Sequence, residues 1–250
     1  MKIVIIGTGN VAYHLAKAFT ENGVEVAQIF GRNPIELEKI GQELGISTSS
    51  TALMVAEMYL ICVRDEAIEE VSKLIPHSDC CVAHTSGAVS RETLQGNYSK
   101  AVFYPLQTFS KNKKINYSEI PFFIDSDSQE NEKKWIELAR KISEKVSLAN
   151  DEKRKYIHLT AVFACNFTNH LYARAKEIAD QQNIPFDFFL PLIDETTRKI
   201  HEMDPKLAQT GPAIRNDLAV IESHKNLISN PEILEIYNTM NLSIKKMYEL

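Results

Sequence analysis

The chain has 250 residues, of which 44% are hydrophobic and 24% are charged, and its formal net charge is −5 at pH 7. The ordinary apolar fraction and the small charge imbalance exclude an intrinsically disordered chain. Mild acidity disfavours binding to nucleic-acid backbones, which requires a basic surface, and no uncharged apolar run is long enough to span a bilayer. We therefore expect neither nucleic-acid nor membrane partners.

The four cysteines are Cys62, Cys80, Cys81 and Cys165. They form no CxxC pair and show no metal-ligand spacing, so we expect neither a disulfide framework nor a metal site. The chain opens on a strand-like run rather than on a basic segment with a cleavage site, which favours a cytoplasmic protein.

The first thirty residues predict a strand, a glycine turn, a helix and a second strand. Residues 2–6 (KIVII) form a β-branched apolar run, helical spacing begins at Val11 and ends at Gly23, and residues 25–30 are again strand-like. The turn between strand and helix reads Gly7-Thr8-Gly9-Asn10-Val11-Ala12.

This GxGxxA pattern has a known physical basis. Gly7 permits a tight turn, Gly9 lets the backbone approach a pyrophosphate, and Ala12 allows close packing of helix on strand. The helix N-terminus then offers N–H groups and a positive dipole end to phosphates. We expect a dinucleotide site here, the alternatives being an unliganded turn or the glycine turn of a methyltransferase.

The end of the second strand favours NADP(H) over NAD(H). An NAD site usually places an acidic residue there for the ribose 2′-hydroxyl, whereas this chain has Gly31-Arg32-Asn33-Pro34. Arg32 can bind a 2′-phosphate and stack on adenine, with Asn33 beside it. The alternative is that Arg32 is only a solvated loop residue.

The remaining first half alternates strands and helices. The expected strands are residues 46–48, 58–63, 80–84, 101–104, 121–124 and 146–149, and the expected helical segments are residues 35–44, 50–56, 67–75 and 131–146. This alternation predicts a doubly wound, mostly parallel sheet, that is, an α/β Rossmann domain over residues 1–150.

Polar residues follow several of these strands, where open α/β sheets bind ligands. Val63 and Arg64 should lie over the nicotinamide ribose. His84-Thr85-Ser86-Gly87 and the loop with Gln107 follow later strands and are candidates for substrate contact. Each also has a plain structural interpretation as a cap or a turn.

Residues 151–250 predict an all-helical domain. A single helix is expected over residues 152–182, with His158, Asn166 and Asn169 among small apolar residues, and further helices over residues 186–201 and 231–248. In Thr210–Asp217, Thr210 can cap a helix whose first turn holds Pro212 and Arg215. This segment is either an ordinary capped helix or an anion-receptive turn.

Five motifs together resemble the Rossmann-like NADP oxidoreductases with an all-helical C-terminal domain, relatives of pyrroline-5-carboxylate reductase and of the β-hydroxyacid dehydrogenases. The motifs are GTGNVA at 7–12, HTSGA at 84–88, PLQTF at 105–109, HLTAVFACNF at 158–167 and TGPAIRND at 210–217. The resemblance implies a nicotinamide near Val63 and His84, a substrate pocket between the domains and a homodimer built through the C-terminal helices.

The chain departs from these relatives at two places. The β-hydroxyacid dehydrogenases carry a Lys four residues before an Asn on the interdomain helix, and the matching position here is Val162 or Cys165. Tyr104 also stands where this branch would have histidine. His158 could replace the missing general acid, because imidazole exchanges protons near neutral pH.

We therefore expect an NADPH-dependent reductase of a small, anionic C=O or C=N compound. His158 would donate a proton, while Ser86, Asn166 and Arg215 would orient the substrate, helped by Thr85, Gly87, Gln107 and Asn169. The alternatives are a non-catalytic NADP(H) sensor, motivated by the missing lysine, and an enzyme that exchanges hydride between NADP and a deazaflavin.

Overall fold

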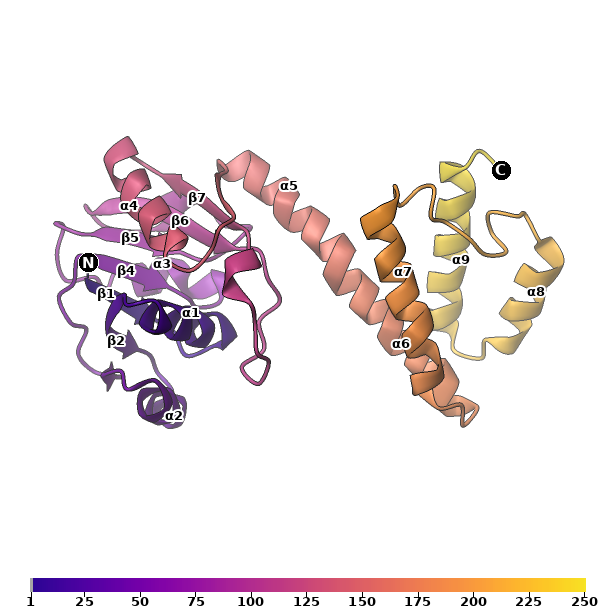
Figure 1. The fold of residues 1–250 in the computed structure, drawn as a ribbon, viewed down its shortest axis with the longest axis horizontal. Coiled ribbons are helices and arrows are strands. Elements are labelled where there is room, and N and C mark those ends of the chain that lie inside the picture. The colour runs from indigo at the N-terminus through magenta and orange to yellow at the C-terminus, as the bar shows by residue number, and fades with distance from the viewer. Residues whose placement is uncertain (1) are drawn as a thin grey trace. The chain divides into compact units, whose positions relative to one another are not determined.

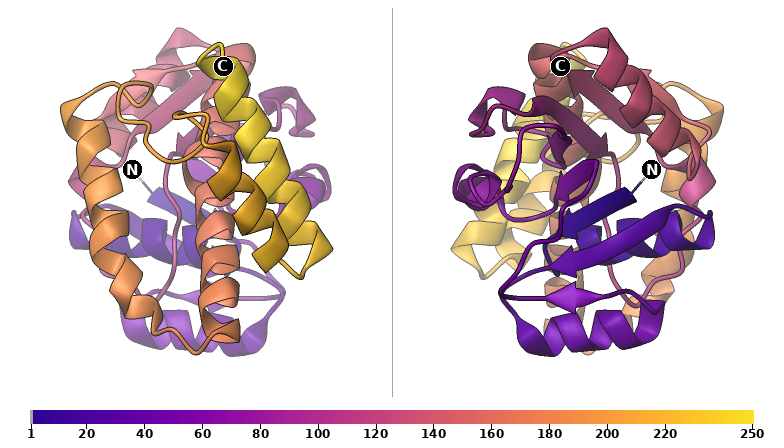
Figure 2. Two further views of the ribbon diagram at one scale, coloured as in Figure 1. Left: turned by 90° about the vertical axis from the view of Figure 1, so that its right-hand side faces the viewer. Right: turned by 90° about the vertical axis from the view of Figure 1, so that its left-hand side faces the viewer.

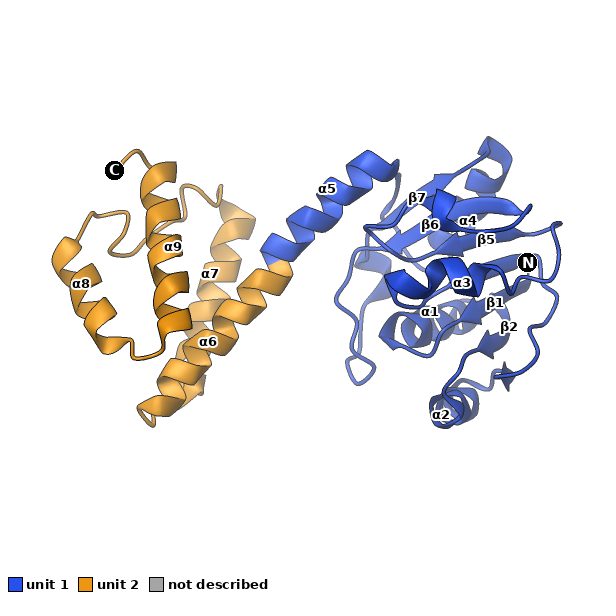
Figure 3. Cartoon of the chain, turned by 180° about the vertical axis from the view of Figure 1, so that it is seen from behind, with its two compact units in different colours: residues 1–164 blue, residues 165–250 orange. Residues whose placement is uncertain are grey.

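The computed structural model describes residues 2–250, which divide into two compact units joined within a long helical segment (Figures 1 and 3). The first unit ends at Ala164 and the second runs from Cys165 to Leu250. The first contains a sheet with helices on both faces, and the second is built of helices, so the predicted α/β class with a Rossmann-like N-terminal domain is confirmed.

The strands of residues 2–250 form one sheet in the order β3-β2-β1-β4-β5-β6-β7-β8. All neighbouring pairs are parallel except β6 and β7. The strand order reverses direction between β1 and β4, which is the point where doubly wound sheets bind ligands. The strands are β1 (Lys2–Ile6), β2 (Glu25–Phe30), β3 (Thr48–Ser49), β4 (Met58–Ile61), β5 (Cys81–His84), β6 (Ser99–Pro105), β7 (Phe122–Ser126) and β8 (Val146–Leu148).

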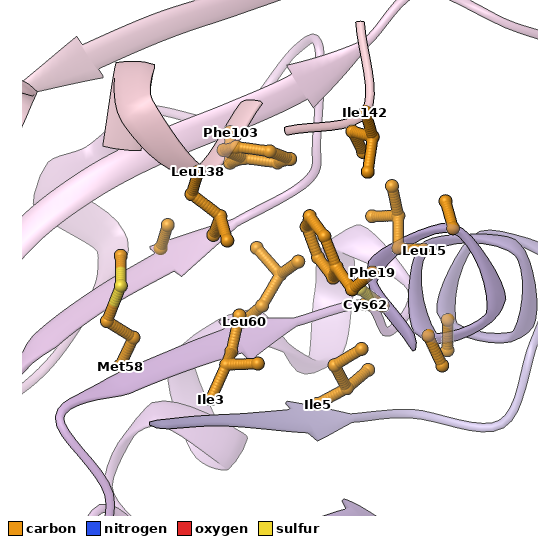
Figure 4. Close-up of a cluster of buried hydrophobic side chains, with 14 of the residues drawn as sticks. Ile3, Ile5, Leu15, Phe19, Met58, Leu60, Cys62, Phe103, Leu138 and Ile142 are labelled. Atoms are coloured by element: carbon orange, nitrogen blue, oxygen red, sulfur yellow. The ribbon is translucent and has the colours of Figure 1, made fainter. Parts of the chain in front are cut away.

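Alternation along β1 divides the core into two layers. Ile3 and Ile5 face one side of the sheet, while Val4 and Ile6 face the other. The first side is covered by α1, α2 and α4, whose apolar residues meet the sheet around Phe19, Leu60 and Phe103 (Figure 4). The second side packs against α3 and the loop that follows β5. Burial on both faces explains why these strands read as continuous apolar runs.

The helices of the first unit follow the sequence predictions with three corrections. Residues 50–56 are not helical, because the Gln28 side chain hydrogen-bonds the backbone of Ala52 and Met54. The helix predicted to reach residue 146 ends at Arg140, and the one predicted over 67–75 is shorter. The helical segments are α1 (Asn10–Glu21), α2 (Pro34–Leu44), the 3₁₀ turn η1 (Asp65–Ala67), α3 (Ile68–Ser72), the 3₁₀ turns η2 (Arg91–Thr93) and η3 (Tyr117–Glu119), α4 (Gln129–Arg140) and α5 (Asp151–Ala161).

The early end of α4 has a packing reason. Ile142 turns into the core, and the Ser143 hydroxyl donates to the carbonyl of Ile120 over 2.5 Å, which carries the chain into β8. A helix continuing to residue 146 would lose both contacts.

The helix predicted over residues 152–182 is interrupted by one π-helical stretch, Val162–Phe167, between α5 and α6. The wider turn shifts the side chains beyond it around the helix axis, so the segment does not follow a uniform 100° per residue. The second unit (Figure 2, left) contains α6 (Thr168–Gln181), the 3₁₀ turn η5 (Phe186–Phe189), α7 (Leu190–Glu202), α8 (Leu218–Leu227) and α9 (Pro231–Met247).

The start of α8 also differs from the prediction. Thr210 caps no helix; the helix begins at Leu218, and the Asp217 carboxylate accepts from the N–H of Val220 over 3.2 Å. Asn216 has φ 50°, a left-handed conformation that cannot continue a right-handed helix, so residues before it form turns instead. Among residues 2–250 no helix is long and apolar enough to cross a membrane.

Candidate functional site

Gly7 forms a tight turn between the ends of β2 and β4. Its φ is 134°, its N–H donates to the carbonyl of Phe30 over 2.8 Å, and a Cβ atom there would overlap the backbone of Cys62, 2.8 Å from its carbonyl carbon. No other residue type fits this position without strain.

Gly9 differs from Gly7, because it is exposed and no atom lies within 4 Å of where its Cβ would stand. It is the N-cap residue of α1, and no side chain caps that helix. The N–H groups of the first turn are thus available, at the positive end of the helix dipole, to an anionic group that approaches the bare backbone.

The rest of the turn is built to hold this geometry. Ala12 is a fully buried residue of α1, as the third small position of the motif requires, while Val11 is half-buried and Thr8 packs against the start of the loop after β2. The Asn10 amide donates to the carbonyl of Phe109 over 2.9 Å, which ties the turn to the loop that follows β6.

Arg32 and Asn33 follow β2 and have different surroundings. Arg32 is exposed and forms no ion pair within residues 2–250. The Asn33 carbonyl oxygen accepts from the N–H groups of Ile35 and Glu36 and caps α2. The guanidinium is therefore free for a ligand, while the amide of its neighbour is engaged in the helix.

At the end of β4 the backbone passes from buried to exposed. Cys62 is buried, and burial raises the pKa of its thiol to about 12, which leaves it an unreactive neutral group. Val63 is half-buried and Arg64 is exposed. These two residues lie beside the glycine turn, since β4 neighbours β1.

The loop after β5 is organised by His84. Its Nδ1 accepts from the N–H of Ser86 over 3.2 Å, so Nε2 carries the proton and donates to the carbonyl of Ser90 at 3.2 Å. His84 is fully buried, and burial lowers its pKa to about 4. It thus supports the loop as a neutral imidazole with no exposed surface to offer a cofactor.

The polar residues of this loop also stabilise its turn. The Ser86 hydroxyl accepts from the N–H groups of Ala88 and Val89 over 3.1 Å, and Ser86 is 9% exposed. Thr85 is half-buried beside Ile61, to which its N–H donates over 3.2 Å. After accepting twice, Ser86 keeps its hydroxyl proton as a donor. Gln107, in the next loop, is exposed.

Three elements converge at Gly87. The Tyr104 hydroxyl, at the end of β6, lies 3.1 Å from Nδ1 of His158, on α5. A Cβ on Gly87 would stand 2.6 Å from Cζ of Tyr104 and 2.8 Å from the same Nδ1. The absence of a side chain at residue 87 makes room for this tyrosine–histidine pair.

Arg154 joins α5 to the sheet and to the loop after β5. It is fully buried one turn before His158, and its guanidinium donates over 2.6 Å both to the Asp151 carboxylate and to the carbonyl of Val89. Asp125 of β7 lies 3.6 Å away and is paired with Arg91 over 2.6 Å. Nε and Nη1 of Arg154 are buried without a hydrogen-bond partner, so the guanidinium is only partly satisfied.

The other predicted site residues belong to the second unit. Asn166 lies in the π-helical stretch, Asn169 in α6 and Arg215 in the turn before α8, and all three are exposed. The structure thus brings together Gly87 and His158 of the predicted set. It adds Tyr104 and Arg154, which sequence analysis did not select, since His158 is distant from Tyr104 in the chain and Val89 is distant from Arg154.

Two further features of residues 2–250 are not part of this site. A hollow of about 820 Å³ lies between α1, α2 and residues 111–117, where Lys111 pairs with Glu36 and the Tyr13 hydroxyl donates to Glu43. No group of three His, Cys, Asp or Glu side chains in the described residues is arranged to hold a metal ion.

Comparison with known proteins found two family models and several similar solved structures. A family model described as a domain of unknown function (DUF2520) matches residues 120–244, half of the chain. The model described as NADP oxidoreductase, coenzyme F420-dependent, matches residues 2–82. A candidate NADP oxidoreductase from Bacteroides fragilis is 38% identical, with a TM-score of 0.93 over 100% of this chain and 98% of that one.

The chain belongs to this family of NADP oxidoreductases. The resemblance inferred from the five motifs is thereby confirmed, and the protein is an NAD(P)-dependent oxidoreductase. A Thermotoga maritima protein, 22% identical with a TM-score of 0.83 over 99% of this chain and 100% of that one, shares the fold. So does pyrroline-5-carboxylate reductase from Coxiella burnetii, 14% identical with a TM-score of 0.58 over 98% and 97%. None of the curated proteins searched matches the chain.

Proposed function

We propose that the protein is an NADP(H)-dependent reductase of a small, anionic C=O or C=N compound. The observation that carries this proposal is the order of side chains along one edge of the sheet. Arg32 follows β2, the glycine turn follows β1, Val63 follows β4, and the Gly87–Tyr104–His158 cluster lies at β5 and β6. Adjacent strands are about 4.8 Å apart, so this edge offers successive contacts to an extended dinucleotide.

The residues present fit this cofactor. The open backbone at Gly9 and the uncapped start of α1 suit the pyrophosphate, with Thr8, Asn10 and Val11 around it. The exposed guanidinium of Arg32 suits the 2′-phosphate of NADP, and residues 31–35 include no acidic residue to favour NAD.

The reaction needs a hydride and a proton. NADPH supplies the hydride when bound. His158 supplies the proton to the oxygen or nitrogen of the substrate, because it is the half-exposed titratable side chain of the cluster. Ser86 can donate its remaining hydroxyl proton to the substrate. Arg215, Asn166 and Asn169 belong to the second unit, and their contact with the substrate stays a prediction.

We further propose that the second unit pairs with a second copy. Few of its residues are buried, whereas Phe188, Leu192 and Leu227 are among its exposed large apolar side chains. An unpartnered helical unit of this size exposes more apolar surface than is usual for a monomer. Sedimentation equilibrium tests this assignment: a dimer that dissociates in Leu192→Asp or Leu227→Asp supports it, and a monomer contradicts it.

Thermal shift measurements test the cofactor. NADPH at one hundred times its Kd should stabilise the protein by about 2.7 kcal/mol. NADH should need higher concentrations, and S-adenosylmethionine should have no effect. Arg32→Ala should weaken the NADPH response selectively, while Arg140→Ala, at the exposed end of α4, should leave it unchanged. A preference for NADH, or one that Arg32→Ala does not alter, would contradict the assignment.

Turnover tests the reaction. NADPH oxidation should be screened with small 2-oxo acids, cyclic imines and their uncharged analogues. We expect the anionic compounds to be turned over. His158→Gln should lower the rate of NADPH oxidation by about 10²-fold or more. His224→Gln, which changes a histidine of α8, should keep the full rate. Full activity of His158→Gln on the identified substrate would contradict the role of His158 as proton donor.

Two alternative functions are each supported by one observation. The description of the model that matches residues 2–82 names coenzyme F420, which motivates a deazaflavin as the hydride partner. An absorbance titration with the deazaflavin tests this alternative. Reduction of the deazaflavin by NADPH in the presence of the protein would support it, and the absence of deazaflavin binding would exclude it. The absence of lysine at residues 162 and 165 motivates a sensor, which tight NADPH binding without any turnover would favour.

A further inference from the structure

We propose that Tyr104 is a positioning residue for His158: its hydroxyl fixes the protonation pattern of the imidazole and supplies the proton that the ring passes on. The inference rests on the proposed reductase function. It concerns the hydrogen bond between the Tyr104 hydroxyl and Nδ1 of His158, 3.1 Å long, which joins the end of β6 to α5.

Burial determines which way this hydrogen bond runs. Tyr104 is only 8% exposed, and within residues 2–250 its hydroxyl has one hydrogen-bond partner, Nδ1 of His158. A buried hydroxyl proton without an acceptor is unfavourable, so the phenol donates and Nδ1 accepts. In the neutral ring the other nitrogen, Nε2, must then carry the hydrogen.

Nε2 is in the right state to act as a donor. No hydrogen bond of the described residues involves it, and His158 is half-exposed. The ring is therefore held at one nitrogen and free at the other, which is the arrangement that a proton donor to a bound substrate needs.

The surroundings hold the pair in this position. Gly87 leaves the space that the two side chains occupy, and the ring of Phe123 lies 6.3 Å from that of Tyr104. Arg154, one turn before His158, fixes the rotation of α5 through Asp151 and Val89. Each contact comes from a different element, so the pair is defined by the fold rather than by a flexible loop.

The proton transfer can be written in balance. The N–H bond at Nε2 breaks and an O–H or N–H bond forms on the substrate, whose carbon takes the hydride that NADPH provides as the double bond becomes single. The O–H bond of Tyr104 breaks and an N–H bond forms at Nδ1, so the imidazole stays neutral. The phenolate left behind regains its proton from Nδ1 when Nε2 of the half-exposed ring takes a proton from solvent, which restores the starting state.

The charge of Arg154 favours this relay. Burial raises the pKa of Tyr104, which opposes loss of its proton, whereas the nearby Arg154 guanidinium lowers it. A positive charge near the phenol stabilises the negative charge that develops there.

The first experiment needs no substrate. The ¹⁵N resonance of Nδ1 in neutral His158, assigned by comparison with His158→Gln, reports the accepted hydrogen bond. It should shift in Tyr104→Phe and stay in place in Tyr98→Phe, which removes a buried hydroxyl that donates to Ser72 and Gln95 just before β6. His224, whose Nδ1 lies 3.0 Å from the Tyr237 hydroxyl, is the internal reference and should respond only to Tyr237→Phe.

The second experiment uses the substrate from the reductase screen. Tyr104→Phe should lower kcat by about 10²-fold and leave NADPH binding unchanged, while Tyr98→Phe and Tyr237→Phe keep full activity. In mixtures of light and heavy water, two protons in flight should give a curved dependence of kcat on the deuterium fraction, which becomes linear in Tyr104→Phe.

The two experiments separate the inference from the proposed function. An unshifted Nδ1 resonance in Tyr104→Phe overturns the inference whatever the activity. A shifted resonance with full kcat, or with a linear isotope dependence in the wild type, shows a structural hydrogen bond and also overturns it. If NADPH neither binds nor is oxidised, the proposed function fails, and the relay fails with it even when the Nδ1 resonance shifts.

Discussion

The backbone of Gly7 lies so close to the carbonyl group of Cys62 that a Cβ atom would stand 2.8 Å from the carbonyl carbon. This contact joins the ends of β1 and β4, where the strand order reverses. The same turn contains Gly9, around which there is open space. Two glycines of one motif thus have separable roles, one in the fold and one in exposing the backbone.

Gly7→Ala should destabilise the protein by at least about 2 kcal/mol, because the residue combines a positive φ of 134° with the overlap at Cys62. Gly9→Ala should unfold at the same urea concentration as the wild type and weaken NADPH binding. Urea unfolding and a fluorescence titration with NADPH measure the two effects. Equal stability losses in the two variants would contradict the distinction.

His84 should make the first unit sensitive to mild acid. Its pKa is about 4 in the fold and 6.5 when exposed, so between these values the unfolded chain binds a proton that the folded chain does not. The stabilising effect is complete above pH 6.5 and is lost as the pH falls toward 4, by about 3 kcal/mol. Urea unfolding at pH 7.5, 5.5 and 4.5 measures it.

His84→Gln is the control for this pH dependence. The variant should be less stable at pH 7.5, because it loses the hydrogen bonds to Ser86 and Ser90, but its stability should fall less on acidification. The same acid sensitivity in wild type and variant would show that another group is responsible.

Arg154→Met should cost about 3–5 kcal/mol of stability, because it leaves Asp151 and Asp125 near each other without their buried cation. Arg91→Met is the matched variant: Arg91 also pairs with Asp125 but is 28% exposed, so its loss should be smaller. Chemical unfolding ranks the two, and hydrogen exchange in α5 should rise in Arg154→Met. A larger loss in Arg91→Met would contradict the role assigned to the buried guanidinium.

Asn10→Ala should loosen the loop after β6 without unfolding the core. It removes the amide hydrogen bond to Phe109, worth about 1 kcal/mol, while His14 keeps its own bond to the carbonyl of Ser110. Hydrogen exchange of residues 107–116 should therefore rise only partly. Thr20→Ala, later on the same helix, should have no effect on that loop, and an unchanged loop in Asn10→Ala would refute the tether.

The fold class was predictable from the sequence because its signals are local. The run KIVII, the glycines at 7 and 9 and the alternation of later strands and helices each depend on nearby residues, and together they predict a parallel sheet with a dinucleotide turn. The helical second half was equally clear. The errors lie where a segment's partners are remote, as at residues 50–56, where the side chain of Gln28 replaces helical hydrogen bonds.

The sequence by itself determined the family, the glycine turn and the candidacy of His158. Only the tertiary structure showed that Tyr104 and His158, 54 positions apart, meet over Gly87, and that Arg154 is buried between β7 and the loop after β5. The physical reason is that a dinucleotide turn is one continuous segment. A proton donor with its partner and buried counter-charges is assembled from strand ends, a loop and a helix, whose approach depends on packing across the whole sheet.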